Sequence, residues 1–160
     1  MNDTITFLGI PSFIPLIFPV LILLLPILSN YYVMMLYALV IGFLLDMFSN
    51  TPGLHAASLV LLAYLRPKLL RLFFQQDKKK LGWARPTMYR LGFMPFVFYI
   101  SASIVIHHFF FFLLQEWSLS NILLILYKTI VSGILSVIMI IIGQFIFYSR
   151  PKFVQTDGRF

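Results

Sequence analysis

The sequence contains no cysteine and few acidic residues. The absence of cysteine from its 160 residues excludes disulfides, thiolate catalysis and cysteine-ligated metal sites. Carboxylates are too few to offer a clear acid–base pair; the five acids are Asp3, Asp46, Asp77, Glu116 and Asp157. A Gly-rich phosphate loop and a nucleophile motif are also lacking. These absences indicate a protein that is not an enzyme and that binds no cofactor.

Charged residues of either sign are scarce, and long apolar runs take their place. Hydrophobic residues make up 61% of the chain, and charged residues only 11%. A soluble domain of this size could not cover so much apolar surface. Apolar runs of about 18 residues, long enough to cross a bilayer, recur along the chain. We therefore expect an all-α polytopic membrane protein, with residues 1–160 forming one integral membrane domain.

The apolar runs predict five transmembrane helices. Their approximate ranges are 7–28, 31–48, 54–74, 91–114 and 120–147. Four prolines in the first range predict a kinked helix. The uncharged part of the third range ends at Leu65, which leaves two compatible interpretations: the Pro52-Gly53 turn dips into the membrane, or the helix continues at the interface with snorkelling basic side chains. Pro67 predicts a bend at the preceding residue.

Positive charge sets the expected orientation. Basic residues gather between Arg66 and Arg90, around a loop at about 75–90, and again near the C-terminus. The positive-inside rule places both segments in the cytoplasm and the N-terminus outside, in a multi-pass protein of the cell (inner) membrane. The net charge of +7 thus flanks the membrane and does not imply nucleic acid. Candidate contacts for anionic lipid or an acidic partner are Arg66, Lys78, Lys79 and Lys80.

Several polar side chains fall in the outer third of the bilayer in this topology: Asp46, His55, His107, His108 and Lys128. A carboxylate in lipid costs roughly 3 kcal/mol on insertion scales, so something must compensate Asp46. It is either a functional group of an outward-facing pocket or a cap that accepts backbone N–H bonds from the following turn. Lys128 either snorkels outward or pairs with Asp46.

His107 and His108 are better interpreted as hydrogen-bonded bundle residues, and a metal site in which Asp46, His55 and His107 converge is the less favoured interpretation. His107 and His108 are adjacent, so they point about 100° apart on a helix, and no local metal-ligand spacing exists.

Helical spacing of four predicts inward faces in three of the ranges. These faces are Ala38, Gly42 and Asp46; Tyr99, Ser103 and His107; and Lys128, Ser132 and Ser136. The small residues of the first set allow close helix contact.

One segment resembles a known family. The run Gly42-Phe-Leu-Leu-Asp46-Met-Phe-Ser-Asn-Thr-Pro52-Gly53-Leu-His55-Ala56, followed by Ala63-Tyr-Leu-Arg-Pro67, resembles the signature of MreD, the small integral-membrane subunit of the bacterial rod-shape system. Three later segments are similar to the same family: Arg90-Leu-Gly-Phe93, Ile106-His-His-Phe109 and Glu116-Trp-Ser-Leu-Ser-Asn121.

The resemblance implies a non-enzymatic scaffold of the elongasome. Such a protein helps maintain rod cell shape by linking an MreC-like single-span protein, RodA and the elongation transpeptidase with the MreB cytoskeleton during lateral peptidoglycan synthesis. The family's fold is similar to the S-component of ECF transporters. The alternative function is therefore an outward-facing membrane component that binds a small molecule or a lipid. Structural or pocket residues would be Gly42, Asp46, Pro52, Gly53, His55, His107 and Lys128.

The chain departs from the family in its number of spans. Family members have six, with both termini inside, whereas the charge pattern here gives five and an outside N-terminus. Two explanations stay open. Either the chain is a five-span variant, or Met1 is an internal start and a preceding helix has been lost.

Overall fold

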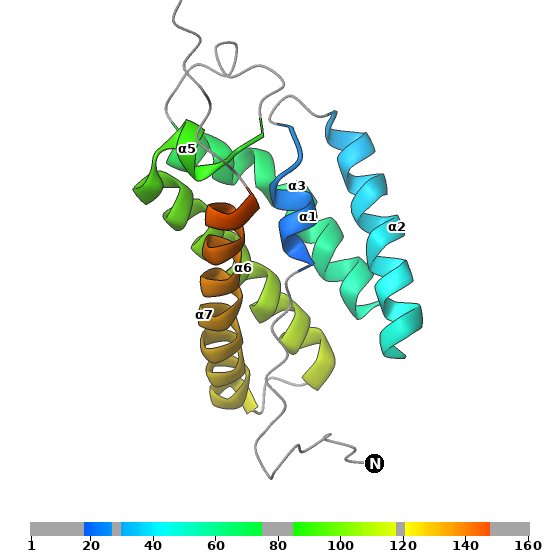
Figure 1. The fold of residues 1–160 in the computed structure, drawn as a ribbon. Coiled ribbons are helices and arrows are strands. Elements are labelled where there is room, and N and C mark those ends of the chain that lie inside the picture. The colour runs from blue at the N-terminus through cyan, green and yellow to red at the C-terminus, as the bar shows by residue number, and fades with distance from the viewer. Residues whose placement is uncertain (1–17, 27–29, 75–84, 118–120, 148–160) are drawn as a thin grey trace, which may run out of the picture.

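The computed structural model describes residues 18–26, 30–74, 85–117 and 121–147, and regular structure in these residues is entirely helical (Figure 1). The helices are α1 (Pro19–Leu23), α2 (Tyr31–Ser49), α3 (Leu54–Phe73), α5 (Met88–Leu91), α6 (Phe93–Glu116) and α7 (Ile122–Phe147). The main packing pairs are α2 with α3, α3 with α6, and α6 with α7. Helices α2 and α7 therefore flank a centre made by α3 and α6.

Three of the described helices, α2, α6 and α7, are long and apolar enough to cross a membrane. This agrees with an all-α membrane protein but not with the predicted count of five spans. The 20-residue helix α3 does not meet the same test, and it carries Arg66, Lys68 and Arg71. Within the first predicted span, only Pro19–Leu23 is helical among the described residues. The parts of that span at 7–17 and 27–28 lie outside the described residues.

Helix α2 has a well-defined beginning and a narrow buried face. The Asn30 side chain caps the helix by accepting the backbone N–H of Tyr32 at 3.0 Å. The buried residues Met34, Ala38, Gly42 and Asp46 follow a spacing of four and include the predicted inward face. The rest of the helix surface is apolar and mostly exposed, as expected of a helix that contacts lipid.

Helix α3 continues through Pro67, so Arg66 before it is helical, and the bend expected there stays a prediction. Proline inside a helix removes one backbone hydrogen bond. Here the packing of the surrounding turns maintains the helix to Phe73, with Arg66 and Leu70 buried on either side of the proline. The helix therefore extends past Leu65, as the second interpretation of this span requires.

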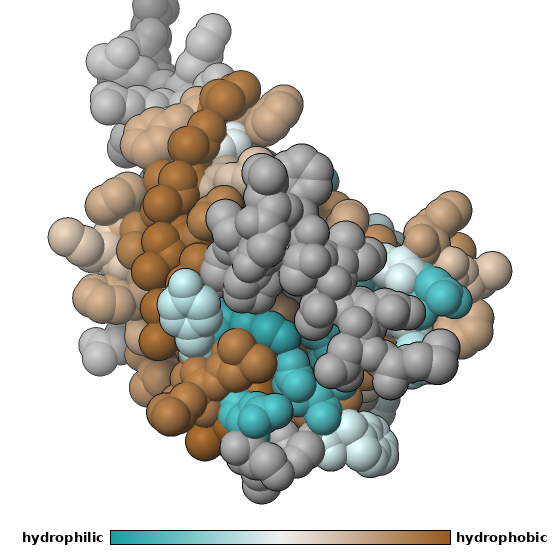
Figure 2. Space-filling view, turned by 90° about the horizontal axis from the view of Figure 1, so that it is seen from below, coloured by the Kyte–Doolittle hydropathy of each residue, from teal (hydrophilic) through white to brown (hydrophobic). Residues whose placement is uncertain are grey.

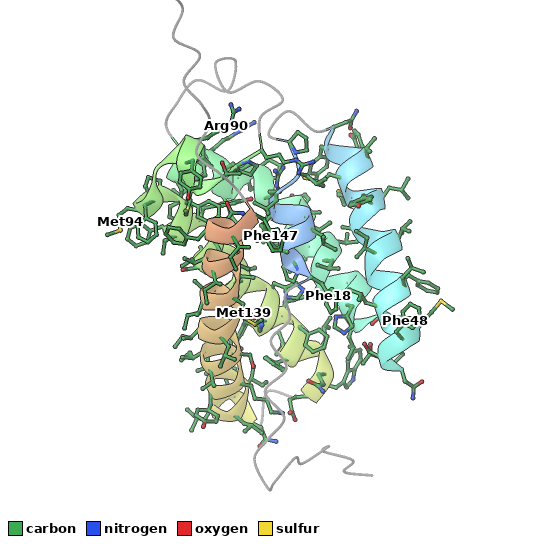
Figure 3. All side chains as sticks on the ribbon, viewed as in Figure 1. Phe18, Phe48, Arg90, Met94, Met139 and Phe147 are labelled. Atoms are coloured by element: carbon green, nitrogen blue, oxygen red, sulfur yellow. The ribbon has the colours of Figure 1, made fainter. Side chains whose placement is uncertain are left out.

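Helices α6 and α7 lie close to their predicted ranges. The expected fourth span is divided at Gly92, whose φ of 89° ends α5 before α6 begins at Phe93. The bundle core lies where α3, α6 and α7 meet, around Leu62, Phe96 and Ile104. Apolar side chains such as Phe48 and Met94 instead project away from the bundle (Figure 3).

Candidate functional site

The Asp46 carboxylate caps helix α3 from the end of helix α2. It is 6% exposed and accepts the backbone N–H groups of His55 at 2.9 Å and Ala56 at 3.0 Å. It also accepts the Thr51 hydroxyl at 2.7 Å. Gly53, at the N-cap position of α3, has no side chain to do this. A carboxylate is favourable at this end of a helix because the free N–H groups carry partial positive charge. The capping interpretation of Asp46 thus agrees with the geometry.

The turn between α2 and α3 depends on two left-handed residues. Asn50 ends α2 with φ 52°, and Gly53 precedes α3 with φ 79°. Between them, the Gly53 N–H donates to the Thr51 carbonyl at 2.8 Å across Pro52. Glycine adopts a positive φ without steric cost. The Pro-Gly pair therefore returns the chain within a few residues and brings the first turn of α3 onto Asp46.

A hollow of about 390 Å³ opens beside this turn. Its lining residues are Phe43, Asp46, Met47, Asn50, Thr51, Pro52 and Gly53. On the face seen from below, hydrophilic residues lie near the centre and again at the right, with hydrophobic residues beside them (Figure 2). The hollow includes three of the predicted pocket residues, Asp46, Pro52 and Gly53. The other four, Gly42, His55, His107 and Lys128, do not line it.

Lys128 pairs with Glu116 and not with Asp46, so the considered Asp46–Lys128 ion pair is wrong. The Lys128 Nζ lies 2.7 Å from the Glu116 Oε1, and both side chains are partly buried. The reason is the length of α6, which extends to Glu116 beside the beginning of α7. The Lys128 side chain reaches back along α7 toward that end, which matches the direction expected for snorkelling.

The three histidines occupy different environments. His108 is hydrogen-bonded as predicted: its Nδ1 donates to the Ile104 carbonyl at 3.0 Å, and its Nε2 lies 3.3 Å from the Ser136 hydroxyl. Neither ring nitrogen of the buried His107 has a hydrogen-bond partner among the described residues, which corrects the prediction for this residue. The Phe111 ring contacts both the His55 ring, at a centroid distance of 4.7 Å, and the His107 ring, at 6.4 Å.

No metal centre emerges in the part of the chain that the structure describes. His55 and Asp46 are neighbours only through the backbone N–H of His55, while the His55 ring contacts Phe111. Within the described ranges, no group of three or more His, Cys, Asp or Glu side chains is placed to hold a metal ion. The possible convergence of Asp46, His55 and His107 is therefore not realised as a ligand set.

Arg66 lies inside the protein, which corrects its prediction as a lipid or partner contact. It is 1% exposed. Its Nε and Nη2 donate to the Leu23 carbonyl at 3.4 and 3.3 Å, and Nη2 also donates to the Leu25 carbonyl. The Tyr99 hydroxyl donates to the same Leu23 oxygen at 3.3 Å. Because α1 ends at Leu23, its last carbonyls need donors, and these two side chains supply them.

The sequence alone gave little sign of this role for Arg66, because the predicted first helix continued to Leu28 and left no free carbonyls at Leu23. The remaining predicted contact residues, Lys78, Lys79 and Lys80, lie outside the described residues. Chemically, the polar groups at the Asp46 end are engaged in capping and ion pairing, and a convergent acid–base pair is not seen among the described side chains.

Comparison with known proteins adds no family assignment: no protein-family model, no curated protein and no solved structure matches this chain.

Proposed function

We propose that this chain is a non-enzymatic membrane scaffold of the MreD type, located in the cell membrane. It would help maintain rod shape by linking an MreC-like single-span protein, RodA and the elongation transpeptidase, and through them the MreB cytoskeleton. The cytoplasmic loop with Lys78, Lys79 and Lys80 would face the filament or anionic lipid. Five spans, with the loop and the C-terminus inside, belong to the same proposal.

The observation that carries this proposal is the use made of the residues that resemble the MreD signature. Asp46 caps α3, Gly42 permits close contact with Ala56, and Gly53 provides the turn. Arg66 secures the end of α1. All four serve to join helices, which is the property that a scaffold needs, and none is left free for chemistry.

Helix α2 offers the partner surface that the proposal requires. It packs mainly against α3, through its narrow face. Its exposed stripe follows a helical spacing of four and three; the stripe is Leu36, Val40, Phe43 and Met47. A single-span partner helix can pack on such a stripe through van der Waals contact, which is a main force for association in lipid.

Co-purification tests the scaffold function. The chain, tagged at its C-terminus, is co-expressed with an MreC-like protein and isolated in a gentle detergent, and stoichiometric recovery is expected. The Leu36→Ser/Phe43→Ser variant on the α2 stripe should lose the partner. The Ile134→Ser/Ile142→Ser variant, at two exposed positions of α7, is the matched control and should retain it. Failure of the unmodified chain to recover the partner would refute the proposal.

The hollow at Asp46 favours a second candidate function, a membrane component that binds a small molecule or lipid. Its volume of about 390 Å³ suits a small ligand. The test is thermal stability in detergent across vitamins and lipid-linked wall precursors. A stabilising compound whose effect disappears in Asp46→Asn would support this function, and no shift with any compound would eliminate it.

A further inference from the structure

A cluster of aromatic and basic side chains lies at the end of the bundle opposite Asp46. Tyr31 and Tyr32 begin α2, and Tyr64 and Lys68 lie in the second half of α3. The Tyr31 ring is 5.4 Å from the Tyr32 ring and 5.9 Å from the Tyr64 ring, centroid to centroid. Lys68 Nζ lies 4.9 Å from the Tyr64 centroid. The antiparallel hairpin thus brings Tyr31 and Tyr32 of α2 together with Tyr64 and Lys68 of α3.

Among the described residues, no carboxylate pairs with the positive charge of this cluster. Arg66, between Tyr64 and Lys68 in sequence, is bonded to carbonyls and to the Met34 sulfur. The one ion pair found within the described ranges is Lys128–Glu116. Near a membrane the effective dielectric constant is below that of water, so the positive charges of Lys68 and Arg66 attract an anion strongly. The cluster is therefore complementary to a negative group.

The surroundings of the cluster are apolar, which favours an anion that also carries an apolar part. Tyr32 is 78% exposed, and Val33 and Leu36 continue the exposed surface along α2. Tyrosine combines an apolar ring with a polar hydroxyl and is typical of the membrane–water interface. A free phosphate would gain nothing from this surface. An amphiphile with an anionic headgroup can use both the charges and the apolar stripe.

We propose that Tyr31, Tyr64 and Lys68 form a binding site for the headgroup of an anionic phospholipid, whose acyl chains lie along the exposed start of α2. Lys68 supplies the mobile cation, and its contact with Tyr64 holds it toward the site. The buried Arg66 adds to the positive potential from behind without touching the lipid. All residues of this site are described by the structure, and the site does not include Lys78, Lys79 or Lys80. It does not depend on the proposed scaffold function.

Native mass spectrometry of the detergent-purified full chain tests this site. The chain is mixed with phosphatidylglycerol or with phosphatidylcholine of the same acyl chains, and the bound lipids are counted. We expect preferential retention of phosphatidylglycerol. Lys68→Ala should weaken it about five-fold, because one basic residue near a membrane contributes roughly 1 kcal/mol. Lys68→Arg should retain it, since the charge and the contact with Tyr64 are both preserved.

Arg71→Ala is the matched control because Arg71 is also exposed and lies three residues further along α3. It should weaken binding clearly less than Lys68→Ala does. Equal retention of the two lipids by the unmodified chain would overturn the proposal. So would equal losses in Lys68→Ala and Arg71→Ala, which would indicate diffuse attraction to a basic rim. Thermal melting of each variant verifies that it is folded.

Discussion

Asp46 serves two helices at once. Its backbone carbonyl accepts the N–H groups of Asn50 and Thr51, which end α2, and its carboxylate accepts N–H groups at the beginning of α3. The cost of placing a carboxylate near lipid is offset because three donors surround it and none of them would otherwise have a partner in the turn. At the scale of single residues, Asp46 thus joins the end of α2 to the beginning of α3.

Removal of the Asp46 carboxylate should therefore destabilise the protein strongly. Asp46→Ala leaves two backbone N–H groups and one hydroxyl without their acceptor, and we expect a loss of about 3 kcal/mol. Asp46→Asn retains one acceptor oxygen and should lose about half as much. Thr51→Val removes a single bond and should cost about 1 kcal/mol. Unfolding by heat or by sodium dodecyl sulfate titration measures the series, and equal losses for Asp46→Ala and Thr51→Val would contradict the capping role.

Single residues were predictable from sequence where their partners are local. The capping role of Asp46 follows from nearby sequence, because the groups that donate to its carboxylate lie within ten residues. Lys128 and Arg66 have partners 12 and 43 residues away. Their roles depend on where α6 ends and where α1 ends, and hydropathy does not locate helix ends that closely.

Between elements, Gly42 of α2 lies so close to Ala56 of α3 that no side chain fits at position 42. A Cβ atom at position 42 would lie 2.4 Å from the Ala56 Cα and 2.7 Å from its backbone nitrogen. Backbone atoms cannot rotate away as a side chain can. The hairpin can form its short interhelical distance only with glycine here, and this distance also brings the first turn of α3 within reach of Asp46.

Gly42→Ala should consequently separate α2 from α3 and lower stability. Overpacking against a fixed neighbour costs roughly 1–3 kcal/mol, and part of the Asp46 cap should be lost with it. Gly143→Ala is the matched control in α7, since a Cβ there meets nothing within 4 Å. Alanine favours helix by up to about 1 kcal/mol, so this control should be neutral or slightly stabilising. The two variants are compared by thermal melting, and equal melting temperatures would refute the close-contact argument.

Whole elements were predicted well where turn residues bound an apolar run, as for the range 54–74, which nearly coincides with α3. The expected ranges 31–48 and 120–147 nearly coincide with α2 and α7. The first range fails among the described residues because α1 ends at Leu23, where Arg66 and Tyr99 bind its last carbonyls. Such tertiary donors are invisible to a hydropathy window, and so is the division of the fourth range at Gly92.

The whole molecule has two chemically different ends. One end carries the Asp46 turn and the Lys128–Glu116 pair, and the other carries the exposed basic residues Lys68, Arg71 and Arg90. Figure 3 shows Arg90 and Phe48 at these opposite ends. Helix α3 connects them, and its 20 residues give a length of roughly 30 Å, which equals the thickness of the hydrocarbon core. The number of membrane crossings thus depends on whether α3 spans despite its three basic residues.

The absence of cysteine makes this question directly measurable. Ser49→Cys and Arg90→Cys place single thiols at exposed positions before and after α3. If α3 crosses the membrane and the basic loop is cytoplasmic, a membrane-impermeant maleimide should label Ser49→Cys on intact spheroplasts. It should label Arg90→Cys only after permeabilisation. Labelling of both thiols from the same side would mean that α3 returns without crossing. Labelling in the reversed order would retain the crossing but invert the orientation that the positive charges predict.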